Sequence, residues 1–101
     1  MLHPALLFDL QALSATCRQY GVHALSVFGS ATREDFRTDS DVDILVEFKP
    51  EHAPSLFRLV EMREDLEAVF GRPVDLATED ILRNPYRRQA IVKDMERLYA
   101  A

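Results

Sequence analysis

Apolar residues in the first part of the chain recur with two different periods, and each period predicts an element. A helix is expected to begin near Pro4 and to end at Gly21, because apolar or aromatic side chains recur there at helical spacing: Leu6, Leu10, Leu13, Cys17 and Tyr20. An apolar strand then runs through 25–28. Cys17 lies on the apolar stripe of the helix, so we expect a small buried thiol in a reducing compartment.

Later segments alternate in the same way between strand and helix patterns. A strand is expected at 41–48, a helix over 56–70 that ends at Gly71, and a short strand at 72–77. Asn84 and Pro85 open a last helix, whose apolar side is Ile91, Val92, Met95, Leu98 and Tyr99. This order predicts an α/β (α+β) fold with a small mixed sheet, helices packed mainly on one face and a site on the opposite face or edge.

Two aspartates stand out in the strand at 41–48. Residues i and i+2 of a strand point the same way, so Asp41 and Asp43 project together while Val42 and Ile44 turn to the other side. Two neighbouring carboxylates repel each other unless a proton or a cation lies between them, and Mg²⁺ is commonly held by one or two carboxylates plus substrate phosphates. The pair therefore predicts a magnesium site.

Gly29 and Ser30 follow the apolar run at 25–28. Glycine permits a sharp turn and a close approach of the backbone to a ligand. The Ser30 hydroxyl can cap a short helix over 31–34, whose first N–H groups attract an anion such as a terminal phosphate. A phosphate site beside a metal site suggests metal-assisted chemistry on a nucleoside triphosphate.

Length and charge narrow the function classes. The 101 residues, almost half of them hydrophobic, predict one domain with one core. A formal net charge of -5 argues against nucleic-acid binding, which needs a basic face. The first residues lack the basic start of a leader, and no stretch approaches the length of a transmembrane helix. We therefore expect a cytoplasmic protein without a membrane partner.

The spacing of these residues resembles a known signature. Gly29-Ser30, ten residues and then Asp41-Val42-Asp43 are similar to the motif of the DNA polymerase β-like nucleotidyltransferases, above all to their minimal single-domain (MNT) branch. The resemblance covers nearly the whole chain and implies a nucleotidyltransferase core over 1–101. It also implies an antitoxin that transfers AMP from ATP to a tyrosine of a HEPN-domain toxin. Larger relatives carry a further helical domain, so we expect a partner protein to complete the site.

The same resemblance suggests roles for further residues. The family uses a third carboxylate on a neighbouring strand, which Asp75 supplies within 72–77. Asp41, Asp43 and Asp75 would then bind two Mg²⁺ ions, and Asp75 could accept a proton. Arg33 is the arginine best placed to hold triphosphate oxygens. Ser40 is also assigned to the nucleotide site, although bracing the turn into the strand is the favoured interpretation.

Several alternatives stay open. The basic segment at 83–93 suits a nucleotide, a partner surface or a solvated helix face equally well. Phe57 and Tyr86 belong either to a partner interface or to the core. Three functions fit: a protein adenylyltransferase, an antitoxin that acts by binding alone, and a nucleotidyltransferase for a small molecule such as an aminoglycoside. The sequence marks neither the nucleotide base nor the strand order.

Overall fold

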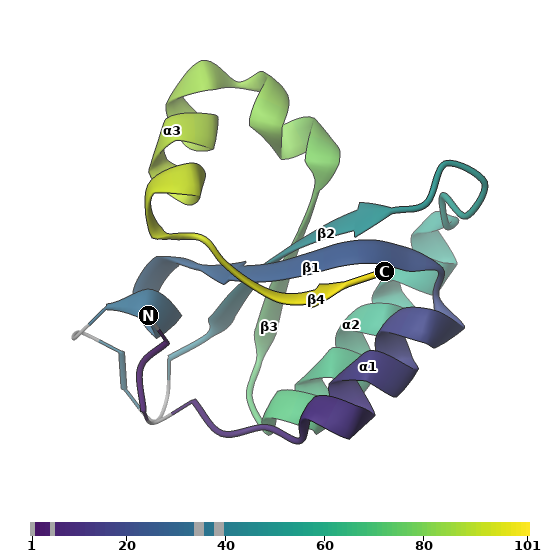
Figure 1. The fold of residues 1–101 in the computed structure, drawn as a ribbon, viewed down its shortest axis with the longest axis horizontal. Coiled ribbons are helices and arrows are strands. Elements are labelled where there is room, and N and C mark those ends of the chain that lie inside the picture. The colour runs from purple at the N-terminus through teal and green to yellow at the C-terminus, as the bar shows by residue number, and fades with distance from the viewer. Residues whose placement is uncertain (1, 5, 34–35, 38–39) are drawn as a thin grey trace.

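The computed structural model describes residues 2–4, 6–33, 36–37 and 40–101. Within these residues four strands and three α-helices alternate, with two short 3₁₀ helices between them (Figure 1). In chain order they are α1 (Leu10–Gln19), β1 (Val22–Phe28), η1 (Gly29–Thr32), β2 (Val42–Phe48), α2 (Leu56–Phe70), β3 (Val74–Thr78), η2 (Glu79–Arg83), α3 (Pro85–Asp94) and β4 (Glu96–Ala100).

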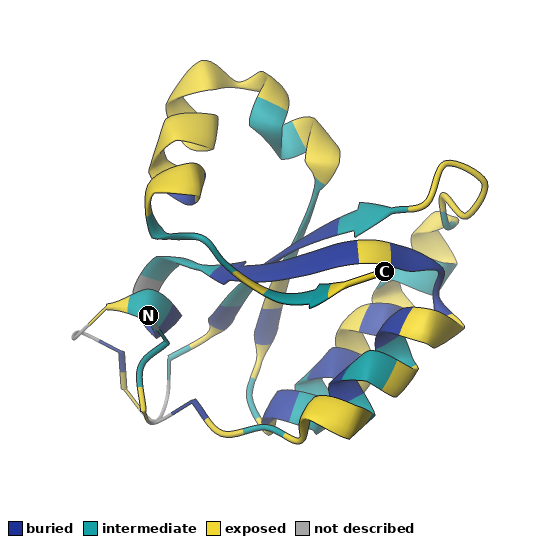
Figure 2. Cartoon of the chain, viewed as in Figure 1, coloured by how far each residue is buried: buried dark blue, intermediate teal, exposed yellow. Residues whose placement is uncertain are grey.

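The strands form one mixed sheet in the order β3-β2-β1-β4. β1 is antiparallel to both of its neighbours, whereas β2 and β3 run parallel. The two central strands are the most deeply buried part of the molecule (Figure 2). The structure thus confirms the predicted mixed α/β fold and adds the strand order.

Helices α1 and α2 pack together against one face of the sheet and build the core with it. Their fully buried side chains meet those of the central strands in one cluster that includes Leu13, Cys17, Leu25, Ile44, Met62 and Leu66. The predicted burial of the Cys17 thiol is confirmed. Because these apolar side chains occupy this face, the alternate positions of the strands are turned to the other one.

The ends of α1 and α2 follow from their capping residues. α2 begins after Ser55, whose hydroxyl accepts a hydrogen bond from the Arg58 N–H, and it ends at Gly71 as predicted, with a left-handed φ of 65°. The predicted start of α1 near Pro4 is wrong. The Asp9 carboxylate accepts a hydrogen bond from the Gln11 N–H and fixes the first helical residue at Leu10.

The chain crosses the second face of the sheet between its two edge strands. η2 and α3 connect β3 to β4, and α3 lies over the face opposite to α1 and α2 (Figure 1). Asn84 caps α3 as predicted, because its side chain accepts hydrogen bonds from the N–H groups of Tyr86 and Arg87. Most of α3 is exposed, and Ile91 is its buried contact with the rest of the fold (Figure 2).

The predicted continuation of the last helix through Leu98 and Tyr99 is wrong. The backbone turns to an extended conformation at Met95, and β4 pairs antiparallel with β1. Leu98 and Tyr99 still pack against the core, as strand residues. Across the described ranges, no helix is both long and apolar enough to cross a membrane.

Candidate active site

The strands bring two of the predicted aspartates together. Asp43 on β2 and Asp75 on β3 are register partners in the parallel pair, so their side chains leave the sheet side by side. Asp43 is also the register partner of Phe28, the last residue of β1. Asp41 lies two residues before Asp43, immediately ahead of β2. Asp43 and Asp75 thus lie together at one end of the sheet, on the side that α3 covers, and Asp41 is near enough for its charge to act on Asp43.

Gly29 lies in close contact with the Asp43 carboxylate. Its φ is 73°, in the left-handed region that L side chains rarely adopt. A Cβ built on Gly29 would overlap the Asp43 Oδ2 atom and come within 3.2 Å of the Asp43 Cγ. The glycine of the motif is therefore required twice over, by its backbone conformation and by the carboxylate beside it.

The environment of Asp43 opposes its ionisation. Burial, as the largest cause, and then the charges of Asp75 and Asp41 raise the pKa of Asp43, while the Arg33 guanidinium lowers it. A divalent cation would relieve both carboxylate repulsions. The charge of Arg33 offsets these effects only in part, because the pKa of Asp43 is still raised.

These carboxylates fit the way in which Mg²⁺ is bound. Among the described residues, no three or more carboxylate, histidine or cysteine side chains are placed close enough together to hold a metal ion by themselves. Mg²⁺ does not need such a group, because it keeps several waters and takes one or two carboxylates together with substrate phosphates. Asp43 and Asp75 supply that donor set, with Asp41 next to them.

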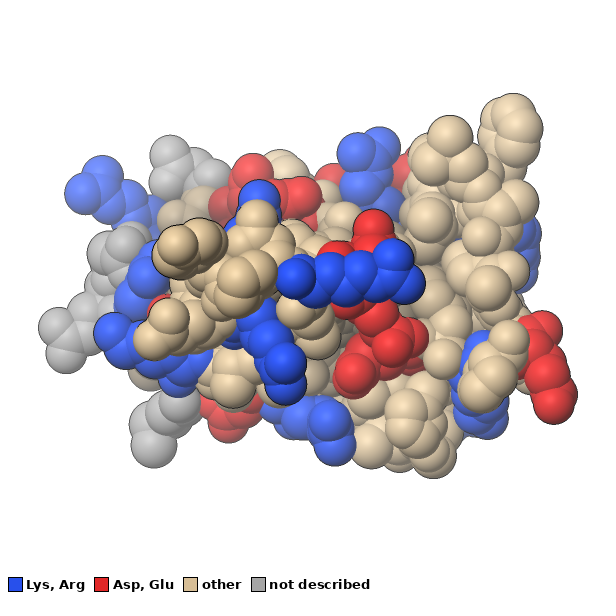
Figure 3. All heavy atoms as spheres, turned by 90° about the horizontal axis from the view of Figure 1, so that it is seen from above, with Lys and Arg blue, Asp and Glu red and all other residues tan. Residues whose placement is uncertain are grey.

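Two adjoining cavities lie between the sheet and α3. The first, of about 490 Å³, is lined by Asp43, Asp75 and Arg87 together with Phe28, Leu76, Ala77, Thr78, Asp80 and Ile81. The second, of about 320 Å³, is lined by Gly29, Arg33, Tyr86, Ala90, Ile91 and Asp94, and it shares Phe28 and Arg87 with the first. Volumes of this size suit a nucleotide. Seen from the α3 side, acidic side chains gather in the middle of the face with basic ones beside them (Figure 3).

Arg33 and Ser40, both assigned to the nucleotide site from the sequence, have different surroundings. The Arg33 guanidinium borders the second cavity and lies 3.5 Å from the Asp94 carboxylate, which ties η1 to the end of α3. The Ser40 hydroxyl accepts a hydrogen bond of 2.9 Å from the Arg37 N–H, so it braces the turn before β2. The Ser30 side chain lies outside the described residues.

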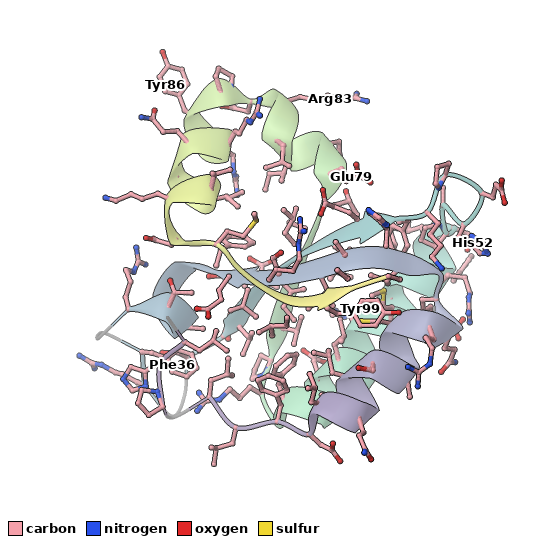
Figure 4. All side chains as sticks on the ribbon, in the orientation of Figure 1. Phe36, His52, Glu79, Arg83, Tyr86 and Tyr99 are labelled. Carbon is pink, nitrogen blue, oxygen red and sulfur yellow. The ribbon has the colours of Figure 1, made fainter. Side chains whose placement is uncertain are left out.

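Arg87 is the residue whose role the sequence left undecided. It lines both cavities, while the side chain of Arg83 points away from the sheet (Figure 4). Helical spacing would have placed the two on one face, because they are four residues apart, and only the break between the 3₁₀ turn that holds Arg83 and helix α3 separates them. Glu47, which shares the strand face of Asp43, lies 4.0 Å from Arg97 of β4 and not among the carboxylates.

Comparison with known proteins identifies the fold family. A family model described as a nucleotidyltransferase domain matches residues 11–98. The chain belongs to this family. Among similar nucleotidyltransferases, a Methanocaldococcus jannaschii protein named as a candidate protein adenylyltransferase is 38% identical over 77 residues, which cover 76% of this chain and 77% of the relative. The protein adenylyltransferase MntA of Thermococcus cleftensis is 46% identical over 66 residues, or 65% of each chain.

Solved structures agree with this assignment. A minimal nucleotidyltransferase with 30% identity superposes with a TM-score of 0.66 over 85% of this chain and 84% of its own. A toxin–antitoxin complex with AMP-PNP gives 0.70 at 20% identity, over 92% and 74%. A complex of tri-AMPylated Shewanella oneidensis HEPN toxin with its MNT antitoxin gives 0.62 at 19% identity, over 91% and 70%. The predicted membership of the minimal nucleotidyltransferases is confirmed.

Proposed function

We propose that this nucleotidyltransferase is an antitoxin that transfers AMP from ATP to a tyrosine hydroxyl of a HEPN-domain toxin. The observation that carries the proposal is the pairing of Asp43 with Asp75 beside Gly29, at the wall of a nucleotide-sized cavity. The relatives' names support protein as the acceptor. The fold shared with a HEPN–MNT complex supports the toxin partner.

Each residue of the proposed site has its own role in AMP transfer. Asp41, Asp43 and Asp75 would hold two Mg²⁺ ions, which supply charge neutralisation of the triphosphate and a more acidic acceptor hydroxyl. Gly29 and Ser30 let the backbone approach the triphosphate, while Arg87 on α3 borders both cavities and Arg33, just after η1, borders the second. Ser40 acts indirectly by holding the turn that leads to Asp41.

The proposed step is an in-line displacement at the α-phosphorus. The tyrosine oxygen forms a bond to this phosphorus, and the bond from the phosphorus to the oxygen bridging the β-phosphate breaks. Pyrophosphate leaves with the electron pair of that bond. The Asp75 carboxylate accepts the phenolic proton, because it is exposed at the edge of the sheet, where an acceptor can reach it. We place this reaction in the cytoplasm, where ATP is abundant.

One incubation decides between the three functions. The chain is mixed with Mg²⁺, ATP labelled at the α-phosphate, a HEPN-domain protein and an aminoglycoside, and mass spectrometry follows which acceptor carries the label. Asp43→Asn should abolish labelling and protection from the toxin. If Asp43→Asn still protects, the chain acts by binding alone. Label on an aminoglycoside and none on protein would instead show a small-molecule nucleotidyltransferase.

A further inference from the structure

The first turns of α2 present apolar side chains that the chain leaves uncovered. Leu56, Phe57 and Val60 are 77, 84 and 41% exposed, whereas Met62 and Leu66 of the same helix are fully buried. The helix therefore has an apolar side beyond the one that faces the core. A group of large exposed apolar side chains of this kind marks an interaction surface rather than a solvated helix face.

Leu56 and Val60 border a hollow of about 230 Å³ between α2 and β3, here called the α2–β3 hollow. Its lining is Leu56, Leu59, Val60 and Arg63 from α2, and Val74, Asp75, Leu76 and Thr78 from β3. The α2 residues recur at positions i, i+3, i+4 and i+7, which is one stripe of a helix. β3 is an edge strand, so the hollow is open along its outer side.

The α2–β3 hollow reaches the proposed active site. Asp75, Leu76 and Thr78 line both this hollow and the 490 Å³ cavity, so one carboxylate belongs to both. The exposed Val92 on α3 differs in this respect, because the hollow next to it is lined by Pro85, Arg88, Gln89 and Lys93 and by no carboxylate. Of these two apolar surfaces, only the first leads to Asp75.

We propose that the α2–β3 hollow is the docking surface for the protein that receives AMP. This inference rests on the proposed function, because it assigns that reaction's protein substrate to a place on the enzyme. The apolar lining takes an aliphatic or aromatic side chain of the acceptor, and Arg63 pairs with an acidic residue next to it. The acceptor tyrosine then lies beside Asp75, where its proton is removed.

The test compares Leu56→Asp/Val60→Asp with Val92→Asp, which adds a charge to an exposed apolar side chain of another helix. Val60→Ser gives a milder change at the same surface. Each variant is first checked for an unchanged melting temperature. Binding to a HEPN-domain protein is then measured by calorimetry in the absence of nucleotide. AMP transfer is measured with labelled ATP, and the binding of Mg²⁺ and ATP is measured without the HEPN-domain protein.

Leu56→Asp/Val60→Asp should weaken HEPN binding and slow transfer by about tenfold or more, with Mg²⁺ and ATP binding unchanged, and Val92→Asp should match the wild type in every assay. Wild-type levels of binding and transfer in the double variant would overturn the docking proposal alone. The docking proposal would also be overturned if the wild type formed a dimer, the double variant were a monomer, and both bound the HEPN-domain protein equally well. HEPN binding that depends on the hollow, without any transfer by the wild type, would instead overturn the proposed function.

Discussion

Asp43 faces Asp75 across the parallel pair of β2 and β3, and no other strand pairing places two carboxylates opposite each other among the residues whose register the structure gives. Like charges in this position destabilise the fold unless a cation joins them. Burial and this neighbour both raise the pKa of Asp43, so the folded chain opposes the ionisation of this carboxyl group. The arrangement favours ligand binding at the expense of stability.

Replacing Asp43 by Asn should therefore abolish transfer and stabilise the protein. The raised pKa means that the ionised form costs folding free energy at neutral pH, and the amide removes that charge. We expect AMP transfer to fall about a hundredfold or more, while the melting temperature measured without Mg²⁺ rises. Glu47→Gln, on the same strand face, is the control and should leave transfer intact. A lower melting temperature for Asp43→Asn would contradict the view that repulsion between Asp43 and Asp75 destabilises the fold.

Replacing Gly29 by Ala should reduce both stability and transfer. The left-handed φ alone costs about 1–2 kcal/mol for alanine. The new methyl group would also displace the Asp43 carboxylate. Gly71 supplies a matched control, because its φ is 65° but no atom lies within 4 Å of its added Cβ. Gly71→Ala should lose a similar free energy of unfolding in urea titrations and keep full transfer. Equal losses of transfer would show that backbone strain, not the Asp43 contact, explains the effect.

Replacing Arg87 by Ala should weaken binding of the triphosphate. Arg87 lines both cavities next to the carboxylates, whereas Arg88 lines the separate hollow beside Val92. Loss of a charged hydrogen bond to phosphate corresponds to about a tenfold weaker affinity for ATP and pyrophosphate in calorimetry. Arg88→Ala removes the same charge and should change neither affinity. Equal effects of the two variants would mean that net charge, not position, matters.

The free energy of unfolding should fall in alkaline solution. Burial is the main cause that raises the pKa of the Cys17 thiol from 9.0 to about 12, and it also raises that of the Tyr20 hydroxyl, from 10.0 to about 12. Both pKa values are higher in the folded than in the unfolded chain, so the stabilisation is complete below pH 9 and is lost as the pH rises toward 12.

Urea titrations between these pH values would measure the loss. Cys17→Ala should lower stability at neutral pH, by removing buried contacts, but should flatten the pH dependence. The thiol should also be unreactive toward a disulfide reagent at pH 8 until the protein unfolds. Rapid reaction of the native thiol would contradict its burial.

The sequence predicted the parts of the fold that local chemistry decides. The end of α2 at Gly71 and the start of α3 after Asn84 were predicted correctly, because a left-handed glycine and an Asn-Pro cap act within one turn of chain. The pairing of Asp43 with Asp75 was also anticipated, though through family resemblance. Two-residue strand periodicity gives the face of each side chain, but it does not say which strands are neighbours.

The start of α1 was missed although its Asp9 cap is local, and the other errors arose where distant contacts decide the structure. The segment around Leu98 continues the helical spacing of α3, but the free edge of β1 offers backbone hydrogen bonds that make it a strand. The role of Arg87 could not be predicted from the sequence either. Arg87 reaches the carboxylates because α3 lies over that face of the sheet, and this placement depends on the whole fold. The exposure of Phe57 also depends on which side of α2 the sheet covers.

The path of α3 from β3 to β4 connects the site to both edges of the sheet. Each end of the segment continues into a strand that is paired with its neighbour, β3 with β2 and β4 with β1. A displacement of α3 would therefore strain the strand pairs at both edges. Substitutions that weaken β4 are expected to reach the aspartates indirectly, through Arg87, which lines the same cavity as Asp43 and Asp75.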